Sequence, residues 1–208
     1  KVLERRAHTL ALNALNHRRR HLARNERIFR IVFKVAPAQR RAVDVDRRGQ
    51  PYADAVFMHL ACARRAVEMT AARGLHVGAH FILGLPGETD AMLLDQVERI
   101  NALPLTTVKF HQLQVFRATP MAAEYDAAPE RFRFWEPEEY IDLFVEILRR
   151  LRPGVVVERF ASEAPPRYHY GRNWGLIRNE TLLAMLEKRL EERGAYQGEI
   201  FIPLCSNH

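Results

Sequence analysis

Hydrophobic and polar positions alternate along residues 76–84, which read His-Val-Gly-Ala-His-Phe-Ile-Leu-Gly. Little charge falls on either set of alternate positions, as is typical of a strand covered on both faces. The following segment, Gly84 to Gly87, allows a sharp turn and a close approach of the backbone to a ligand. Thr89 or Asp90 can then cap a helix with apolar residues at helical spacing. Because ligands of α/β proteins bind where strands end in such turns, this stretch is the first candidate site.

The rest of the chain divides into segments of strand-like and helix-like pattern. Three further segments rich in β-branched and aromatic residues are predicted strands: 28–35, 106–116 and 155–160. Segments of helical pattern, weak in the first of them, are predicted helices: 3–24, 52–73, 89–103, 136–151 and 179–193. Asn179 is the predicted N-cap of the last helix. Residues 118–134 are predicted to form an irregular loop with a short turn at 121–125.

Strands and helices alternate at spacings of about 30 residues or more, as parallel βαβ units require. Four such units make about half of an eight-unit barrel. The predicted fold class is therefore α/β, a partial (incomplete) β/α barrel of parallel strands with outer helices. Three parts are expected: a basic, divergent N-terminal segment over 1–50, the barrel over 51–196 and a tail over 197–208.

The chain is basic, with a net charge of +7 over 208 residues and a pI near 9.8. Much of the excess is arginine near the N-terminus: Arg5, Arg6, Arg18, Arg19, Arg20, Arg24, Arg27, Arg30, Arg40, Arg41, Arg47 and Arg48. Two explanations stay open, a solvated helix face followed by a loose basic segment, or contact with nucleic acid. No apolar run approaches the roughly 20 residues of a membrane span, and no signal peptide is visible. We therefore predict no membrane partner and expect a cytoplasmic location.

The sequence contains two cysteines, Cys62 and Cys205, which lie far apart. Two such residues make neither a disulfide framework nor a four-ligand metal site. A histidine metal site at His80 and His111 would need a third ligand at suitable spacing, and the sequence offers none. No metal ligands are therefore predicted.

Polar side chains fall on both faces of the predicted strand 106–116. Lys109 and His111 share one face, and Gln112 and Gln114 the other. Such residues in a strand flanked by helices are unusual unless some of them point into a pocket. Lys109 and His111 are therefore the candidate catalytic residues. The alternatives are a lysine that reaches solvent from a strand end and a core histidine bonded to a backbone carbonyl.

Two groups near the C-terminal end carry weaker signals. Arg159 and Glu163 can form a structural ion pair at the end of a strand. The aromatic residues Tyr168, Tyr170 and Trp174 can either stack on nucleic-acid bases or pack the last helix over the open side of the barrel. The sequence does not decide between these two roles.

Short blocks of sequence follow one another in a characteristic order: Ala79–Glu88, Val108–His111, Thr119–Pro120, Glu138–Tyr140, Glu163–Pro165 and Tyr196–Gly198. In this order they resemble the later barrel strands of the radical S-adenosylmethionine (SAM) superfamily. Within it, they are similar to the uncharacterised bacterial branch related to the catalytic subunit of the elongator complex. The resemblance covers about residues 64–198 and rests on the ordered set, since Gly-Leu-Pro-Gly alone is a weak signal.

The resemblance implies SAM and a [4Fe-4S] cluster as cofactors, with SAM cleaved reductively to a 5′-deoxyadenosyl radical and an electron donor as partner. It also implies positions for the cofactor. The strand that contains His80, Ile82 and Gly84 packs beside the adenine of SAM, and the turn through Gly87 shapes the same end of the site. Without the resemblance, these glycines are explained by a tight strand-to-helix turn.

Lys109 and His111 match a family strand whose side chains face the barrel interior near the substrate. The resemblance does not name that substrate. Relatedness to the elongator subunit and the basic charge of the chain make RNA one expectation, by analogy alone.

The chain departs from the family at the cluster. Family members hold it with three cysteines, each binding one iron, while SAM chelates the fourth iron. Cys62 and Cys205 cannot supply three thiolates, so this chain is not expected to be active as an enzyme by itself. The predicted function is that of a fragment or divergent member of a radical SAM enzyme family. Two alternatives remain, a cluster-less basic module that binds nucleic acid or protein, and a truncated product without function.

Overall fold

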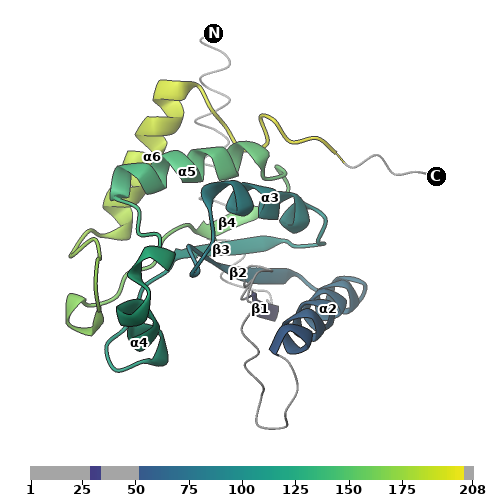
Figure 1. Ribbon diagram of the computed structural model, residues 1–208. Coiled ribbons are helices and arrows are strands. Elements are labelled where there is room, and N and C mark those ends of the chain that lie inside the picture. The colour runs from purple at the N-terminus through teal and green to yellow at the C-terminus, as the bar shows by residue number, and fades with distance from the viewer. Residues whose placement is uncertain (1–28, 34–51, 204–208) are drawn as a thin grey trace.

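The computed structural model describes residues 29–33 and 52–203, which form a parallel sheet with helices packed around it (Figure 1). Its strands follow the order β1-β2-β3-β4: β1 is Phe29–Phe33, β2 Val77–Leu83, β3 Thr107–Gln112 and β4 Val156–Arg159. Each strand lies beside the strand that precedes it in the chain, as in a β/α barrel, whereas a doubly wound sheet reverses its order. The predicted fold class, a partial barrel of parallel strands, is confirmed.

The helices in the described part of the chain are α2 (Tyr52–Ala71), α3 (Asp90–Asn101), α4 (Pro120–Ala127), α5 (Pro137–Arg150) and α6 (Asn179–Arg193). Two 3-10 turns, η1 (Pro129–Arg131) and η2 (Pro166–Tyr168), interrupt the loops. In Figure 1, α3, α5 and α6 lie above the sheet, and α2 lies beside β1 and β2. None of the described helices is long and apolar enough to cross a bilayer. The predicted helix 3–24 and most of the segment 1–50 lie outside the described residues.

The predicted turn at 121–125 is part of a helix, α4. Its N-cap is Thr119, whose hydroxyl accepts a hydrogen bond from the Ala122 N–H at 3.3 Å, and Pro120 opens the first turn. Proline is favoured there because the missing N–H would have no partner inside the helix. The Thr-Pro pair is thus the sequence signal for α4, since so short a helix leaves no periodic apolar stripe.

The face of β2 and β3 that packs on α3 and α5, the outward face, contributes to the main core. Its side chains are at most 4% exposed: Val77, Ala79, Phe81, Leu83, Val108 and Phe110. Phe110 stacks on Phe81 at 5.6 Å between ring centroids and meets Phe144 of α5 edge-on at 5.3 Å. Leu93 and Val97 of α3 belong to the same cluster. The helices on this side therefore cover one face of the sheet with hydrophobic side chains.

A second, smaller cluster lies beyond the carboxyl ends of β2 and β3. Its buried members are Leu85, Leu113, Val115, Ala122 and Phe132. Ile82, Tyr125 and Tyr170 pack against it. Gly171 lies so close to Tyr125 that a Cβ on this glycine would be 2.9 Å from the ring. The segment 118–134, predicted as an irregular loop, is thereby fixed over the ends of the strands.

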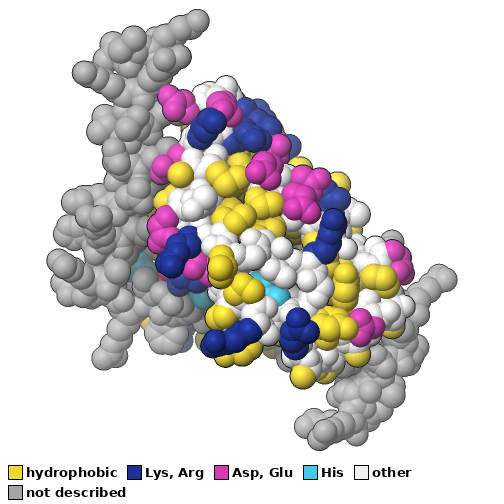
Figure 2. Space-filling model, turned by 90° about the vertical axis from the view of Figure 1, so that its left-hand side faces the viewer, with side chains coloured by type: hydrophobic (Ala, Val, Ile, Leu, Met, Phe, Trp, Pro, Cys, Tyr) yellow, Lys and Arg dark blue, Asp and Glu magenta, His cyan; other side chains and the backbone are white. Residues whose placement is uncertain are grey.

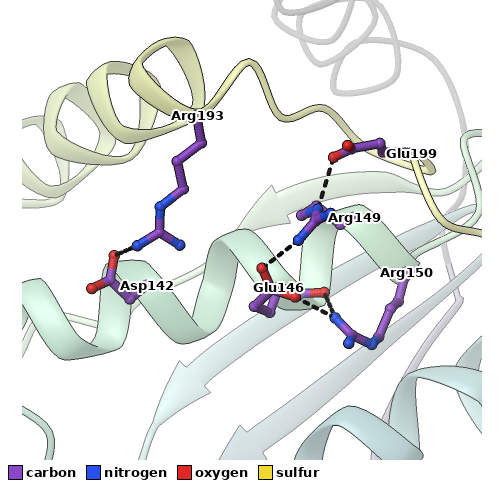
Figure 3. Close-up of polar contacts among 6 residues, drawn as sticks. All are labelled: Asp142, Glu146, Arg149, Arg150, Arg193 and Glu199. Carbon is purple, nitrogen blue, oxygen red and sulfur yellow. Dashed lines mark hydrogen bonds and ion pairs between the residues drawn. The ribbon is translucent and has the colours of Figure 1, made fainter.

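Ion pairs join α5 to α6 and to the segment that follows α6 (Figure 3). Arg149 contacts Glu146 within α5 and Glu199 beyond α6, each at 2.7 Å. Arg193 of α6 contacts Asp142 of α5, also at 2.7 Å. Partly exposed pairs of this kind contribute little individually, and their effect here is to fix how the last helix lies on α5.

The predicted tail begins at Gln197 with residues that are packed against the end of α5. The Gln197 side-chain amide donates to the carbonyls of Arg152 and Val155 at 2.9 and 2.8 Å. A Cβ on Gly198 would lie 2.5 Å from Pro153. This close approach gives a physical reason for glycine in the last of the sequence blocks.

The predicted N-cap of the last helix is wrong. The N-cap of α6 is Arg178, and Asn179 is the first helical residue. The Asn179 N–H donates to the carboxylate of Glu163, which comes from the loop after β4. A carboxylate at a helix N-terminus satisfies a free N–H and complements the helix dipole. Glu163 therefore serves this helix rather than pairing with Arg159 as predicted.

Candidate functional site

Alternate residues of β2 and β3 share the face of the sheet that is turned away from α3 and α5. The register pairs Gly78 with Thr107, His80 with Lys109 and Ile82 with His111. Paired residues of parallel strands point to the same side, so all six lie on this inward face. The face is thus polar in β3 and mixed in β2, and the sequence prediction that Lys109 and His111 share a face is confirmed.

His80 and His111 are half-buried and stack on each other, with 5.6 Å between ring centroids and 28° between planes. Burial, together with the nearby charges of His80, Arg159 and Lys109, lowers the pKa of His111 to about 4. The His111 imidazole is therefore neutral at pH 7. In that form one ring nitrogen donates a hydrogen bond and the other accepts one.

Lys109 forms an ion pair with Glu158 of β4, at 3.0 Å, and both side chains are only 16% exposed. Lys109 does not reach solvent from the end of the strand, which was one alternative for it. Sequence reasoning missed Glu158, because an irregularity in the pairing of β3 with β4 brings it beside Lys109. The only sequence signal for it is a pair of charged residues, Glu158 and Arg159, after a run of valines.

The backbone N–H groups in the turn from Gly84 to Glu88 all have hydrogen-bond acceptors. The buried carboxylate of Glu88 accepts from the N–H groups of Gly84 at 3.0 Å and Leu85 at 2.8 Å. The Gly87 N–H donates to the Arg131 carbonyl at 2.7 Å. Burial raises the pKa of Glu88, and its hydrogen bonds oppose that rise. These contacts support the explanation that Gly84 and Gly87 form a tight strand-to-helix turn.

The backbone at Gly84 closely approaches a side chain of the protein itself, Trp135. A Cβ on Gly84 would lie 2.6 Å from the indole ring, and the φ angle of this residue is +85°. The Trp135 indole N–H donates to Asp90 of α3 at 3.1 Å, and its carbonyl accepts from the Trp174 indole at 2.8 Å. Trp135 was not singled out from the sequence, because only the folded chain brings it beside Gly84.

The remaining predicted residues serve packing to different extents. Ile82 is half-buried against the second cluster. The Gln112 amide exchanges hydrogen bonds with the backbone of Ser162, at 2.9 and 2.8 Å, and does not enter the inward face. Trp174 packs on Tyr140 at 5.1 Å, while Tyr168 is 49% exposed. The aromatic group therefore divides, with Trp174 packed against the core and Tyr168 on the surface.

A small pocket opens at the carboxyl end of β3, on the outward side of the sheet. Its walls are Gln112, Leu113, Gln114, Arg133, Phe134, Trp135, Glu136, Arg172, Asn173 and Trp174. Both arginines already have acidic neighbours, Arg133 with Asp90 at 2.8 Å and Arg172 with Glu136 at 3.7 Å. Basic and acidic side chains are also interspersed across the face in Figure 2, seen from the side on which α4 lies. The pocket therefore offers a ligand no unpaired arginine.

Within the described part of the chain, no three His, Cys, Asp or Glu side chains are placed to hold a metal ion. Cys62 is exposed on α2, and Cys205 lies outside the described residues. The residues present thus do not fit an iron–sulfur cluster. The inward face, with His80, Lys109 and His111, is the best candidate for binding a ligand.

Comparison with known proteins agrees with the fold and with the family resemblance. Residues 105–192 match the radical SAM C-terminal domain family. This part of the chain is similar to radical SAM carboxy-terminal domains. The predicted relation to the radical SAM superfamily is thereby confirmed. The match includes β3, α4, α5 and β4, and most of α6.

Several relatives align with half or more of this chain. The uncharacterised protein YtqA of Bacillus subtilis is 29% identical over 140 residues, which are 67% of this chain and 42% of YtqA. YhcC of Escherichia coli is 33% identical over 104 residues, which are 50% of this chain and 33% of YhcC. The uncharacterised protein MJ0486 of Methanocaldococcus jannaschii is 28% identical over 138 residues, which are 66% of this chain and 42% of MJ0486. The chain thus spans less than half the length of these relatives.

A solved structure has the same fold. The Elp3 protein of the archaeon Methanocaldococcus infernus, with N-terminal residues 1–46 deleted, superposes with a TM-score of 0.53 at 18% identity. The superposition covers 64% of this chain and 30% of that one. The chain therefore shares its fold with part of a much longer protein.

Proposed function

We propose that this chain forms part of the wall of a radical SAM active-site barrel, with β2 beside the adenine of SAM and the inward side chains of β3 facing the substrate. The observation that carries the proposal is the register of β2 and β3. It places His80, Ile82, Lys109 and His111 on one face, opposite the hydrophobic core. A barrel encloses its ligand with this face, while the outer helices stabilise it from behind.

In the family, the [4Fe-4S] cluster supplies the electron that cleaves SAM. The chain contains two cysteines and the cluster needs three, so we place the cluster ligands outside these 208 residues. What the described residues supply is recognition. The neutral His111 donates or accepts a hydrogen bond, and Glu158 holds the Lys109 ammonium in place. An RNA substrate stays a prediction by analogy.

The first test is to determine the DNA sequence upstream of the Lys1 codon and to translate it in all three frames. The proposal expects an open frame that encodes three closely spaced cysteines in a strand–helix context. If no frame encodes such a triplet, radical chemistry is ruled out for this gene, and binding of polyanions becomes the function to examine.

The second test measures SAM binding to the protein encoded by that longer frame, by equilibrium dialysis. Ile82→Ala should weaken SAM binding about tenfold, because it removes an apolar contact from the adenine side. Ile177→Ala is the matched control, since this isoleucine is also partly buried but packs on the main core. Equal affinities for the two variants would contradict the assignment of β2 to the adenine.

A further inference from the structure

The inward face ends in a group of charges created by an irregularity in the sheet. β3 and β4 are in register at Val108 and Val157, but the next pair is Lys109 with Arg159, which leaves Glu158 as an extra residue in β4. In such a bulge, two residues of one strand lie opposite one residue of its neighbour. Glu158 and Arg159 are therefore both brought beside Lys109.

These charges do not balance among the residues that the structure describes. Glu158 offsets Lys109 at 3.0 Å, whereas Arg159 is exposed and forms no ion pair with a described carboxylate. The positive charge of Arg159 acts electrostatically on His111 and helps to lower its pKa. The charged and titratable groups that face His111 are, by strand, His80 of β2, Lys109 of β3, and Glu158 and Arg159 of β4. Among these described groups, the positive charge of Arg159 is not offset by a carboxylate.

We infer that this corner of the inward face binds an oxyanion, a phosphate or carboxylate group of the substrate, between Arg159 and His111. A guanidinium binds such a group through two parallel hydrogen bonds, and a neutral imidazole donates another through its ring N–H. Glu158 repels an anion from the Lys109 side and so directs it towards Arg159. The inference rests on the proposed function, because it names the chemical group that the substrate presents to this face.

The test follows the histidine ring signals of the 208-residue chain by NMR during titration with inorganic phosphate and, separately, with acetate. Sodium chloride at the same ionic strength is the reference for both. A bound anion favours the imidazolium, so the pKa of His111 should rise from about 4 by about one unit, a tenfold change in proton affinity. His111→Gln identifies the signal. A response to phosphate alone assigns a phosphate ester, and a response to acetate assigns a carboxylate.

Arg159→Gln should abolish the response, and Arg159→Lys should retain part of it, because the charge remains without the fork-shaped donor. Arg167→Gln is the control, since that guanidinium lies on the surface, stacked on the Tyr168 ring at 4.8 Å. The amide spectrum of each variant reports whether it is folded. The inference is overturned if neither anion acts beyond the chloride reference, or if Arg159→Gln responds like the unmodified chain.

Failure of this inference can be told apart from failure of the proposed function. Adenosine has no anionic group, so its binding depends on the adenine side and not on Arg159. Adenosine binding without an anion response would leave the proposed function standing and remove the oxyanion site. An anion response without adenosine binding would leave the oxyanion site standing and contradict the placement of β2 beside the adenine.

Discussion

The two faces of β2 and β3 differ in what their side chains do, although they alternate along the same few residues. On the outward face, Phe81 and Phe110 are buried to 4% exposure or less and pack on α5 through Phe144. On the inward face, His80 and His111 stack on each other in a half-buried position. Burial of apolar surface stabilises a fold, whereas half-buried polar groups cost desolvation unless they gain partners. The outward face therefore holds the domain together, and the polar inward face is the one that we propose binds a ligand.

The largest expected loss of stability comes from a substitution on the outward face. Phe110→Ala should lower the free energy of unfolding by about 3–5 kcal/mol, because it leaves a cavity between Phe81 and Phe144. The adjacent change on the inward face, His111→Ala, should cost less than about 1 kcal/mol. Urea unfolding of both variants measures the contrast. Similar losses for the two would contradict the division of the sheet into a stabilising and a ligand-binding face.

A smaller loss is expected where β2 turns into α3. Gly84→Ala places a Cβ 2.6 Å from Trp135 at a φ of +85°, so it should cost about 2–4 kcal/mol. Gly175→Ala is the matched control, because its φ is +65° but no atom lies within 4 Å of the added Cβ. It should cost only about 1 kcal/mol for the backbone conformation. Equal unfolding midpoints would show that Trp135 yields to the methyl group.

The inward face should also make stability depend on pH. The pKa of His111 is about 4 in the folded chain, against an ordinary value of 6.5. As pH falls below 6.5, the unfolded chain takes up the proton first, so the free energy of unfolding decreases until about pH 4. With solvent around the ring, the loss is up to about 2 kcal/mol. Urea midpoints at pH 7 and 4.5 should differ less in His111→Gln than in the unmodified chain.

The smallest effect concerns the ion pair of the inward face. Lys109→Met should destabilise the chain by about 1 kcal/mol, because Glu158 keeps its charge and loses the ammonium. The double variant Lys109→Met/Glu158→Leu should regain most of that loss, since neither member of the pair is then left without the other. Thermal unfolding of both variants checks this. A double variant less stable than the single one would show that Glu158 has a structural role apart from Lys109.

Local patterns in the sequence predict most of the fold. Alternating apolar positions locate the strands, and Thr89, Pro137 and Gly194 lie at helix ends as the sequence suggests. The N-cap of α6 was predicted wrongly because the carboxylate that serves its first N–H, from Glu163, comes from 16 residues upstream. Capping motifs are defined by neighbours within one turn, so a contact of that range carries no local signal.

The candidate site could be predicted only in part. The alternation in β3 correctly puts Lys109 and His111 on one face, since side chains in a strand have a period of two. The counter-ion Glu158 depends on the irregular pairing of β3 with β4, and Trp135 depends on how the segment after α4 folds back onto Gly84. Both are consequences of tertiary packing, which periodicity along the chain does not encode.

The most direct test of the account is to map adenosine binding on the isotope-labelled chain by the amide shifts in its NMR spectrum. The account predicts that the shifts concentrate in β2 and β3, with the largest at the inward residues Gly78, His80, Ile82, Lys109 and His111. Shifts confined to residues 1–51, or none at saturating adenosine, would contradict the claim that this inward face is where the protein binds its ligand.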